Sequence, residues 1–238
     1  MNKKLSKNHF PAHKKFYLSR FVYSRFLTTW LILLCTFIYL PIVATEFQTI
    51  NVGPKDAGRL NDIIKKAPAR SKIVFRKGTY HFTKPIRITS KSHLNLQAQE
   101  GVYFILDNLH LSVLRIGSSD NIKLSGFHIR HRKPVSKEEY CYGQVITISR
   151  SHDLELTNLE LNGSGTVGVH IYSGSSITIK DSWFHHNSIA GIWMLSFVDN
   201  IVIQNNRFDN NPVHIKTRRS GSHEWKKYAT LDGNTFDD

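Results

Sequence analysis

Cysteine is nearly absent from the sequence, which has only two such residues among 238. Cys35 lies within an apolar N-terminal segment, and Cys141 stands alone beyond it. No intramolecular disulfide is therefore expected, and the stability of the fold must come from packing and hydrogen bonding. The chain is long enough to bury one sizeable core without covalent cross-links.

Acidic residues are missing from the first 25 positions, which carry seven lysines and arginines. An uncharged stretch, FLTTWLILLCTFIYLPIVA, follows from Phe26 to Ala44, and its length lies between that of a signal-peptide core and that of a minimal membrane span. Residues 1–44 are therefore interpreted as a signal peptide that is cleaved after Ala44 or as a signal anchor that stays in the membrane. Both alternatives engage the membrane and export residues 45–238, which would be periplasmic, secreted or membrane-anchored.

The exported part has no excess of acid, since it contains 25 basic and 18 acidic residues and has a formal charge of +7. A basic surface favours acidic partners. We expect an acidic polysaccharide as the partner, and no nucleic acid is expected to bind. The alternative is a soluble surface whose basic charge has no partner.

Helical periodicity is scarce in the rest of the chain, where short alternating segments take its place. One set of inward positions repeats at spacings of 32, 23, 24 and 28 residues. Its copies are Ile122-Leu124-Phe127-Ile129, Leu154-Leu156-Leu159-Leu161, Ile177-Ile179-Ser182-Phe184, Ile201-Ile203-Asn206-Phe208 and Ala229-Leu231-Asn234-Phe236. A second alternating pair precedes them: Leu114/Ile116, Ile146/Ile148, Val169/Ile171, Ile192/Met194 and Val213/Ile215.

Alternation with period two is typical of strands that bury one face. A unit of about 23 residues with three short strands cannot bury its inner face alone, but stacked copies can. The repeat therefore predicts an all-β parallel solenoid. Leucine-rich repeats have a similar period, but their fixed Leu/Asn framework is missing here.

The stretch from Lys55 to Ala67 is the exception, because Leu60, Ile63 and Ile64 have helical spacing. It predicts a short amphipathic helix that covers the open first coil, since an uncovered solenoid end would expose a strand edge.

The segment GRLNDIIKKAPARSKIVFRKGTYHFTKPIRI, followed by rungs such as DNIVIQNNRFDNN, resembles the right-handed parallel β-helix superfamily, the pectate-lyase-like fold, over residues 48–238. The resemblance implies a right-handed parallel β-helix with three strands and three connections in each coil. It does not select an activity, because the superfamily holds lyases, hydrolases, epimerases and non-catalytic adhesins. In its catalytic members the groove lies on the outer face of the third strand of each coil.

The outward positions of that third strand hold Arg115, Thr147, His170, Trp193 and His214, and two residues further on Ser149, Tyr172, Leu195 and Lys216. Aromatic rings offer flat faces for sugars, and cationic side chains suit carboxylates. We therefore expect Trp193 and Thr147 to bind substrate. The alternative is that Thr, Tyr, Trp and His lie outward merely because they suit strands.

If this groove cleaves a uronate polymer, the reaction needs a group that neutralises the carboxylate, a base and an acid. Arg115 or Lys216 is expected to neutralise the carboxylate. His170, His214, Tyr172 or Lys216 is expected to serve as base or acid.

His185 and His186 follow the inward Phe184 and are expected to begin a loop, with their side chains toward water. They are candidate substrate-binding residues. Consecutive histidines on an extended segment point apart, so no metal site is predicted from this pair alone, and zinc or copper would need donors from neighbouring rungs.

The segment KTRRSGSHEWKKY between Ile215 and Ala229 predicts a long basic loop, in which Arg218, Arg219 and Trp225 suit a polyanion. The cofactor requirement is open. A calcium-dependent reaction would need clustered acids, and Glu138, Glu139 and Asp209 are the nearest candidates. The paired aspartates of the polygalacturonase relatives are missing.

The sequence thus predicts an exported β-helix protein that binds and, as a lyase-like enzyme, cleaves an acidic polysaccharide. A non-catalytic envelope β-helix that binds glycans or proteins is the alternative, and resemblance to periplasmic copper-delivery β-helix proteins is a third. The chain stops just after Phe236 with no visible cover for the last coil. Either the sequence is truncated there, or another chain associates with that edge.

Overall fold

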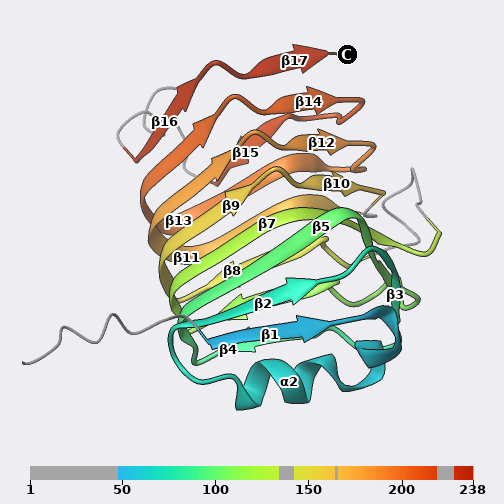
Figure 1. Cartoon of the computed structure of the whole chain (residues 1–238). Coiled ribbons are helices and arrows are strands. Elements are labelled where there is room, and N and C mark those ends of the chain that lie inside the picture. The colour runs from blue at the N-terminus through green and yellow to red at the C-terminus, as the bar shows by residue number, and fades with distance from the viewer. Residues whose placement is uncertain (1–47, 134–141, 164–165, 219–227, 238) are drawn as a thin grey trace, which may run out of the picture. The chain divides into compact units, whose positions relative to one another are not determined.

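The computed structural model describes residues 48–133, 142–163, 166–218 and 228–237, which wind into a parallel coil with three faces (Figure 1). Every strand pairing is parallel, and each strand pairs with its counterpart in the next coil. This is the all-β parallel solenoid that the repeat predicts. Residues 26–44, the expected signal peptide or anchor, lie outside the described residues. Within the described part of the chain, no helix is long and apolar enough to span a membrane.

The first face is built from the Ile-x-Ile segments. It contains β1 (Gln48–Val52), β2 (Ser71–Phe75), β9 (Ser151–Thr157), β16 (Ala229–Asp232), the first halves of β5 (Ser92–Leu106) and β7 (Asp120–His131), and the second halves of β11 (Val167–Lys180) and β13 (Ala190–Gln204). Ile179 and Ile203 lie opposite each other in adjacent coils, as the repeat predicts.

The second face follows across a tight turn. It contains β3 (Gly78–Phe82), the ends of β5 and β7, β10 (Glu160–Asn162), β12 (Trp183–His185), β14 (Arg207–Asp209) and β17 (Thr235–Asp237). The turn holds its residues at positive φ, including Asn158 and Asn205 at 53° and Gly126 at 83°. Asn and Gly suit this left-handed conformation.

The third face closes the coil. It contains β4 (Ile86–Thr89), β6 (Leu114–Gly117), β8 (Ile146–Ser149), the starts of β11 and β13, and β15 (Ile215–Thr217). Gly191 is required at the start of β13 because a Cβ there would lie 2.7 Å from the Phe208 ring.

The core is a stack of inward Ile, Leu, Val and Phe side chains from all three faces. The predicted N-terminal helix is present as η1 (Pro54–Arg59) and α2 (Leu60–Lys66), and it buries Leu60 and Ile64 against the first coil. At the other end, β17 pairs with β14, and no described element covers its outer edge. Phe236 is 48% exposed there. Association through this edge stays a prediction.

The inward Ser182 and Asn206 form a buried polar ladder at the turn between the first and second faces. The Ser182 N–H donates to Asn206 Oδ1 at 3.0 Å, and Asn206 Nδ2 donates to the Ile179 carbonyl at 2.9 Å. Asn206 is 1% exposed. The ladder therefore satisfies backbone groups that the turn removes from the strand pairing.

One expected register is wrong. Val213 and Ile215 were expected opposite Ile192 and Met194, but Ile192 pairs with Ile215. A shift of two residues leaves the alternation of inward and outward side chains unchanged, so the pattern alone could not detect it.

Replacing Asn206 with alanine should lower the free energy of unfolding by about 2–4 kcal/mol, because the buried Ser182 N–H and Ile179 carbonyl both lose their partner. Thr230→Ala, on the exposed side of β16, should change it by less than about 0.5 kcal/mol. Urea unfolding of the full chain, followed by circular dichroism, measures both. Equal effects would show that the ladder does not stabilise the turn.

Candidate functional site

The third face carries a continuous outward row of polar and aromatic side chains. Parallel pairing places the same strand position of each coil beside that of the next, about 4.8 Å apart. The row runs Arg87, Arg115, Thr147, His170, Trp193 and Lys216. Arg115, Thr147, His170 and Trp193 are therefore brought together as predicted. Lys216 also lies on this row, opposite Trp193, instead of on the line of Tyr172 where it was expected.

Aromatic stacking organises the middle of the row. The His170 imidazole stacks on Tyr172 at 4.0 Å and on Trp193 at 4.9 Å, with an angle of 8° between the His170 and Trp193 ring planes. The Lys216 ammonium lies 4.3 Å from the centre of the Trp193 ring, a cation–π contact. The four side chains thus form one packed surface that ends in a positive charge.

His170 is buried under its neighbours and only 6% exposed, although it faces outward. Burial lowers its pKa to about 4, so the imidazole is neutral at neutral pH. Neither ring nitrogen, both of which are buried, has a hydrogen-bond partner among the described residues. A buried polar group of this kind is costly unless something satisfies it, which makes His170 a candidate for contact with a ligand.

A groove of about 510 Å³ lies beside this stack. Its lining includes Arg87, Arg115, Thr147, Arg150 and Tyr172. Burial raises the pKa of Tyr172, and the nearby positive charge of Arg115 opposes this shift. Tyr172 therefore keeps its proton at neutral pH, while the arginines supply the positive charge of the groove.

His214 does not join the row, because the corrected register places it before β15. Its ring packs at the corner of the coil, 5.2 Å from Phe236 and 6.0 Å from Phe208. The expectation that it faces the groove is wrong. Arg218 is exposed beyond β15. Arg219 and Trp225 lie outside the described residues.

The expected position of His185 is also wrong. β12 extends through His185, whose side chain is 6% exposed and stacks on Trp183 at 3.8 Å. The chain leaves the strand only at His186, which has a φ of 56° and is exposed. Both histidines therefore belong to the second face and not to the third-face groove.

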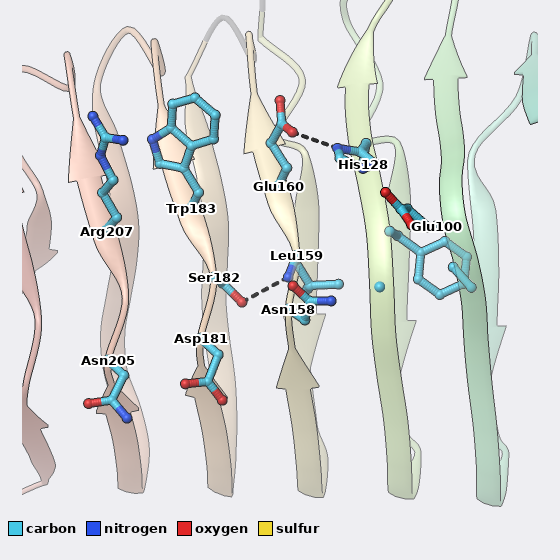
Figure 2. Close-up of a pocket in the computed structure, with 13 residues that line it drawn as sticks. Glu100, His128, Asn158, Leu159, Glu160, Asp181, Ser182, Trp183, Asn205 and Arg207 are labelled. Atoms are coloured by element: carbon cyan, nitrogen blue, oxygen red, sulfur yellow. Dashed lines mark hydrogen bonds and ion pairs between the residues drawn. The ribbon is translucent and has the colours of Figure 1, made fainter.

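The second face carries its own outward row, and none of its members was expected to be a site residue. Tyr103, His128, Glu160, Trp183 and Arg207 lie opposite one another in successive coils. The inward Phe184 and Phe208 would have identified the neighbouring Trp183 and Arg207 as outward, because alternation defines both sides of a strand. This row lies beside a hollow of about 730 Å³ (Figure 2).

Glu160 is the centre of that row. One carboxylate oxygen lies 2.5 Å from Nδ1 of His128 and the other 3.3 Å from Nε2 of His185. The hydrogen bond from His185, followed by that from His128, lowers the pKa of Glu160 to about 2 despite its partial burial. Glu160 is therefore ionised at neutral pH.

Metal binding receives no support in the described part of the chain, where no group of three or more His, Cys, Asp or Glu side chains is arranged to hold an ion. Asp209, a candidate for calcium, lies on the second face and pairs with Arg207 at 3.0 Å. Glu138 and Glu139 are outside the described residues. The copper-delivery alternative likewise finds no donor set among the residues described.

Comparison with known structures identifies the fold. A proposed glycosyl hydrolase from Parabacteroides merdae aligns with a TM-score of 0.61 and 12% identity, over 78% of this chain and 97% of its own. The ORF18 protein of Geobacillus virus E2 aligns with a TM-score of 0.56 and 14% identity, over 97% of this chain and 44% of its own. Pectate lyase Pel9A has a TM-score of 0.46 at 12% identity, over 75% of this chain and 57% of its own. At such identities the likeness concerns architecture and not activity.

No curated protein matches the chain in sequence. The family model described as "Right handed beta helix region" matches residues 107–237, more than half of the sequence. That match covers most of the coils whose parallel pairing is described above. The chain therefore belongs to the right-handed β-helix family.

Proposed function

We propose that this protein binds an acidic polysaccharide along the third face of the β-helix. The observation that carries the proposal is the outward row in which stacked rings adjoin cations on successive coils. Trp193 and Tyr172 offer apolar surface to sugar rings. Arg87, Arg115 and Lys216 offer charge-assisted hydrogen bonds to uronate carboxylates.

A polymer suits this surface better than a single sugar. The row repeats at the spacing of the coils, about 4.8 Å, so that consecutive residues of an extended chain meet consecutive rungs. The groove is shallow and polar, and its positive charge increases the local concentration of a polyanion. Each contact is modest, and the affinity is expected to grow with the length of the polymer.

Cleavage by β-elimination is a second candidate function, and it is favoured by the lowered pKa of His170, which keeps the imidazole neutral at neutral pH. A neutral imidazole can accept the proton beside the carboxylate, and Tyr172 keeps the proton that the leaving oxygen needs. Arg115 lies close enough to Tyr172 to affect its pKa and would neutralise the carboxylate. The non-catalytic alternative uses the same surface without proton transfer.

The proposal includes export, because polysaccharides of this kind lie outside the cytoplasm. Residues 1–44 would direct residues 45–238 across the membrane, with or without cleavage after Ala44. The cofactor requirement is left open.

Trp193→Ala should weaken binding of polygalacturonate or alginate by about tenfold, because the sugar loses the apolar surface of the indole and the packed stack around it. Trp193→Phe should stay within about threefold of the natural protein. Arg115→Ala should weaken binding by about fivefold, whereas Arg76→Ala, an equal loss of charge at an exposed position between β2 and β3, should have little effect. Calorimetric titration of the full chain measures these changes. Equal losses for the two arginine variants would show that only net charge matters.

If the protein is a lyase, unsaturated products absorbing in the ultraviolet should accumulate from a polyuronate, and His170→Ala should abolish them while retaining binding. Because the pKa of His170 is lowered to about 4, the base stays unprotonated down to that pH. The rate should therefore show no loss as pH falls from 7 to 5.5, and activity should decline only near pH 4. A midpoint near 6.5 would show that the base is not a histidine whose pKa is lowered by burial. Binding without products would leave the non-catalytic alternative.

A further inference from the structure

The hollow on the second face is separate from the third-face groove and has no part in the proposed function. Figure 2 shows its side chains arranged on neighbouring strands, with Glu160, Trp183 and Arg207 above and Asp181 and Asn205 below. The upper residues come from β10, β12 and β14, and the lower ones from the turns that precede those strands. Rigid strands therefore hold the whole set.

A chain of hydrogen bonds determines the protons of its histidines. An ionised Glu160 can only accept, so His128 donates from Nδ1 and His185 donates from Nε2. Nδ1 of His185 lies 2.9 Å from Nδ1 of His186, so that one of these two nitrogens donates to the other. Nε2 of His128 takes no part in the bond to Glu160. His128 lines the hollow, where this nitrogen can form a hydrogen bond with a hydroxyl group.

Trp183 provides an aromatic platform. His185 packs against the indole at 3.8 Å, and the Arg207 guanidinium lies 5.1 Å from the ring centre. Figure 2 shows the indole broadside, between Arg207 and Glu160. Its Nε1, which is buried, has no hydrogen-bond partner among the described residues. The supported ring is therefore held in one orientation, as a stacking surface requires.

The charge of this hollow is opposite to that of the third-face groove. Its lining includes three carboxylates, Glu100, Glu160 and Asp181, and one cation, Arg207. Asp181 is exposed and has a φ of 53°, at the turn position that Asn158 and Asn205 occupy in neighbouring coils. Carboxylates and amides at adjacent rungs accept hydrogen bonds from hydroxyls, but the carboxylates repel a uronate.

We propose that the second-face hollow is a binding site for an uncharged saccharide, which stacks on Trp183, donates a hydroxyl hydrogen bond to Asp181 and forms a second hydrogen bond with Nε2 of His128. Asn158 and Asn205 extend the hydrogen-bonding surface to the neighbouring rungs. Arg207 donates to ring or hydroxyl oxygens at one end of the site. The protein thereby has two glycan-binding faces of opposite charge.

Calorimetric titration of the full chain with neutral hexasaccharides of β-1,4-linked glucose, mannose and xylose tests the site. At least one should bind, with a Kd of about 10 μM to 1 mM, a range suited to an open site with one aromatic platform. Trp183→Ala should weaken that binding by about tenfold, and Trp183→Phe should restore it to within about threefold. Asp181→Asn should weaken it by about threefold, since Asn tolerates the same backbone conformation.

Two control variants match these changes. Phe197→Ala removes an aromatic side chain that is 79% exposed on β13 and lies outside the hollow. Asp153→Asn alters an exposed aspartate with a φ of 52° near the start of β9, outside the hollow. Both should leave saccharide affinity within about twofold.

The absence of binding to every neutral hexasaccharide would overturn the proposal, as would binding that Trp183→Ala leaves unchanged. Tighter binding of deacetylated chitohexaose than of any neutral sugar would overturn the uncharged assignment and indicate an amine ligand. A protein that binds polygalacturonate but no neutral sugar would disprove this site without affecting the third-face proposal. A protein that binds a neutral hexasaccharide but no polygalacturonate would disprove the third-face proposal without affecting this site.

Discussion

Parallel hydrogen bonding between successive coils is the constraint on which the molecule depends. Because each strand pairs in register with its counterpart, residues at equivalent repeat positions lie directly above one another. Inward positions then form continuous stacks, such as Phe184, Phe208 and Phe236 with ring centres 4.9 and 5.2 Å apart. The polar Ser182 and Asn206 fit the same rule, since Ser182 Oγ accepts from the Leu159 N–H and Asn206 bonds to backbone groups of Ser182 and Ile179 in the neighbouring coil. This arrangement can be stable without cross-links, because every coil supports the next.

The same register determines which side chains are neighbours on the outer surface. Side chains separated by 23 to 32 residues in sequence become neighbours, and one outward position per coil suffices to build a row. The third-face row combines Arg115, His170, Trp193 and Lys216 into a cationic, aromatic surface. The second-face row places Glu160 between two histidines. The two surfaces are both polar, but opposite charge suits them to different ligands.

Much of the fold could be predicted from the sequence, and the reason is the period of the repeat. The alternation around Ile177, Ile179, Ile201 and Ile203 defined both the strands and their pairing, and the spacing of Leu60 and Ile64 identified the terminal helix. The third-face row was predicted for four coils and failed in the fifth. There the alternation allows either Val213 or Ile215 to lie opposite Ile192, and the structure has Ile215. In this register the His214 ring packs against Phe208 and Phe236. His185 was misplaced because the strand was expected to end at Phe184, whereas β12 continues through His185 and keeps its ring on the same side as Trp183.

By itself, the sequence determined that the chain is a parallel β-solenoid with a helical cover at one end, because short alternating strands at a regular period bury their apolar side chains only when successive coils stack. Only the tertiary structure decided how polar side chains combine, since contacts between coils join residues that no local pattern connects. The burial of His170 between Tyr172 and Trp193, and the bonds that tie His128 and His185 to Glu160, exist only once the coils are stacked. The physical reason is that desolvation and hydrogen bonding depend on neighbours in space, whereas alternation records only which side of its own strand a residue occupies.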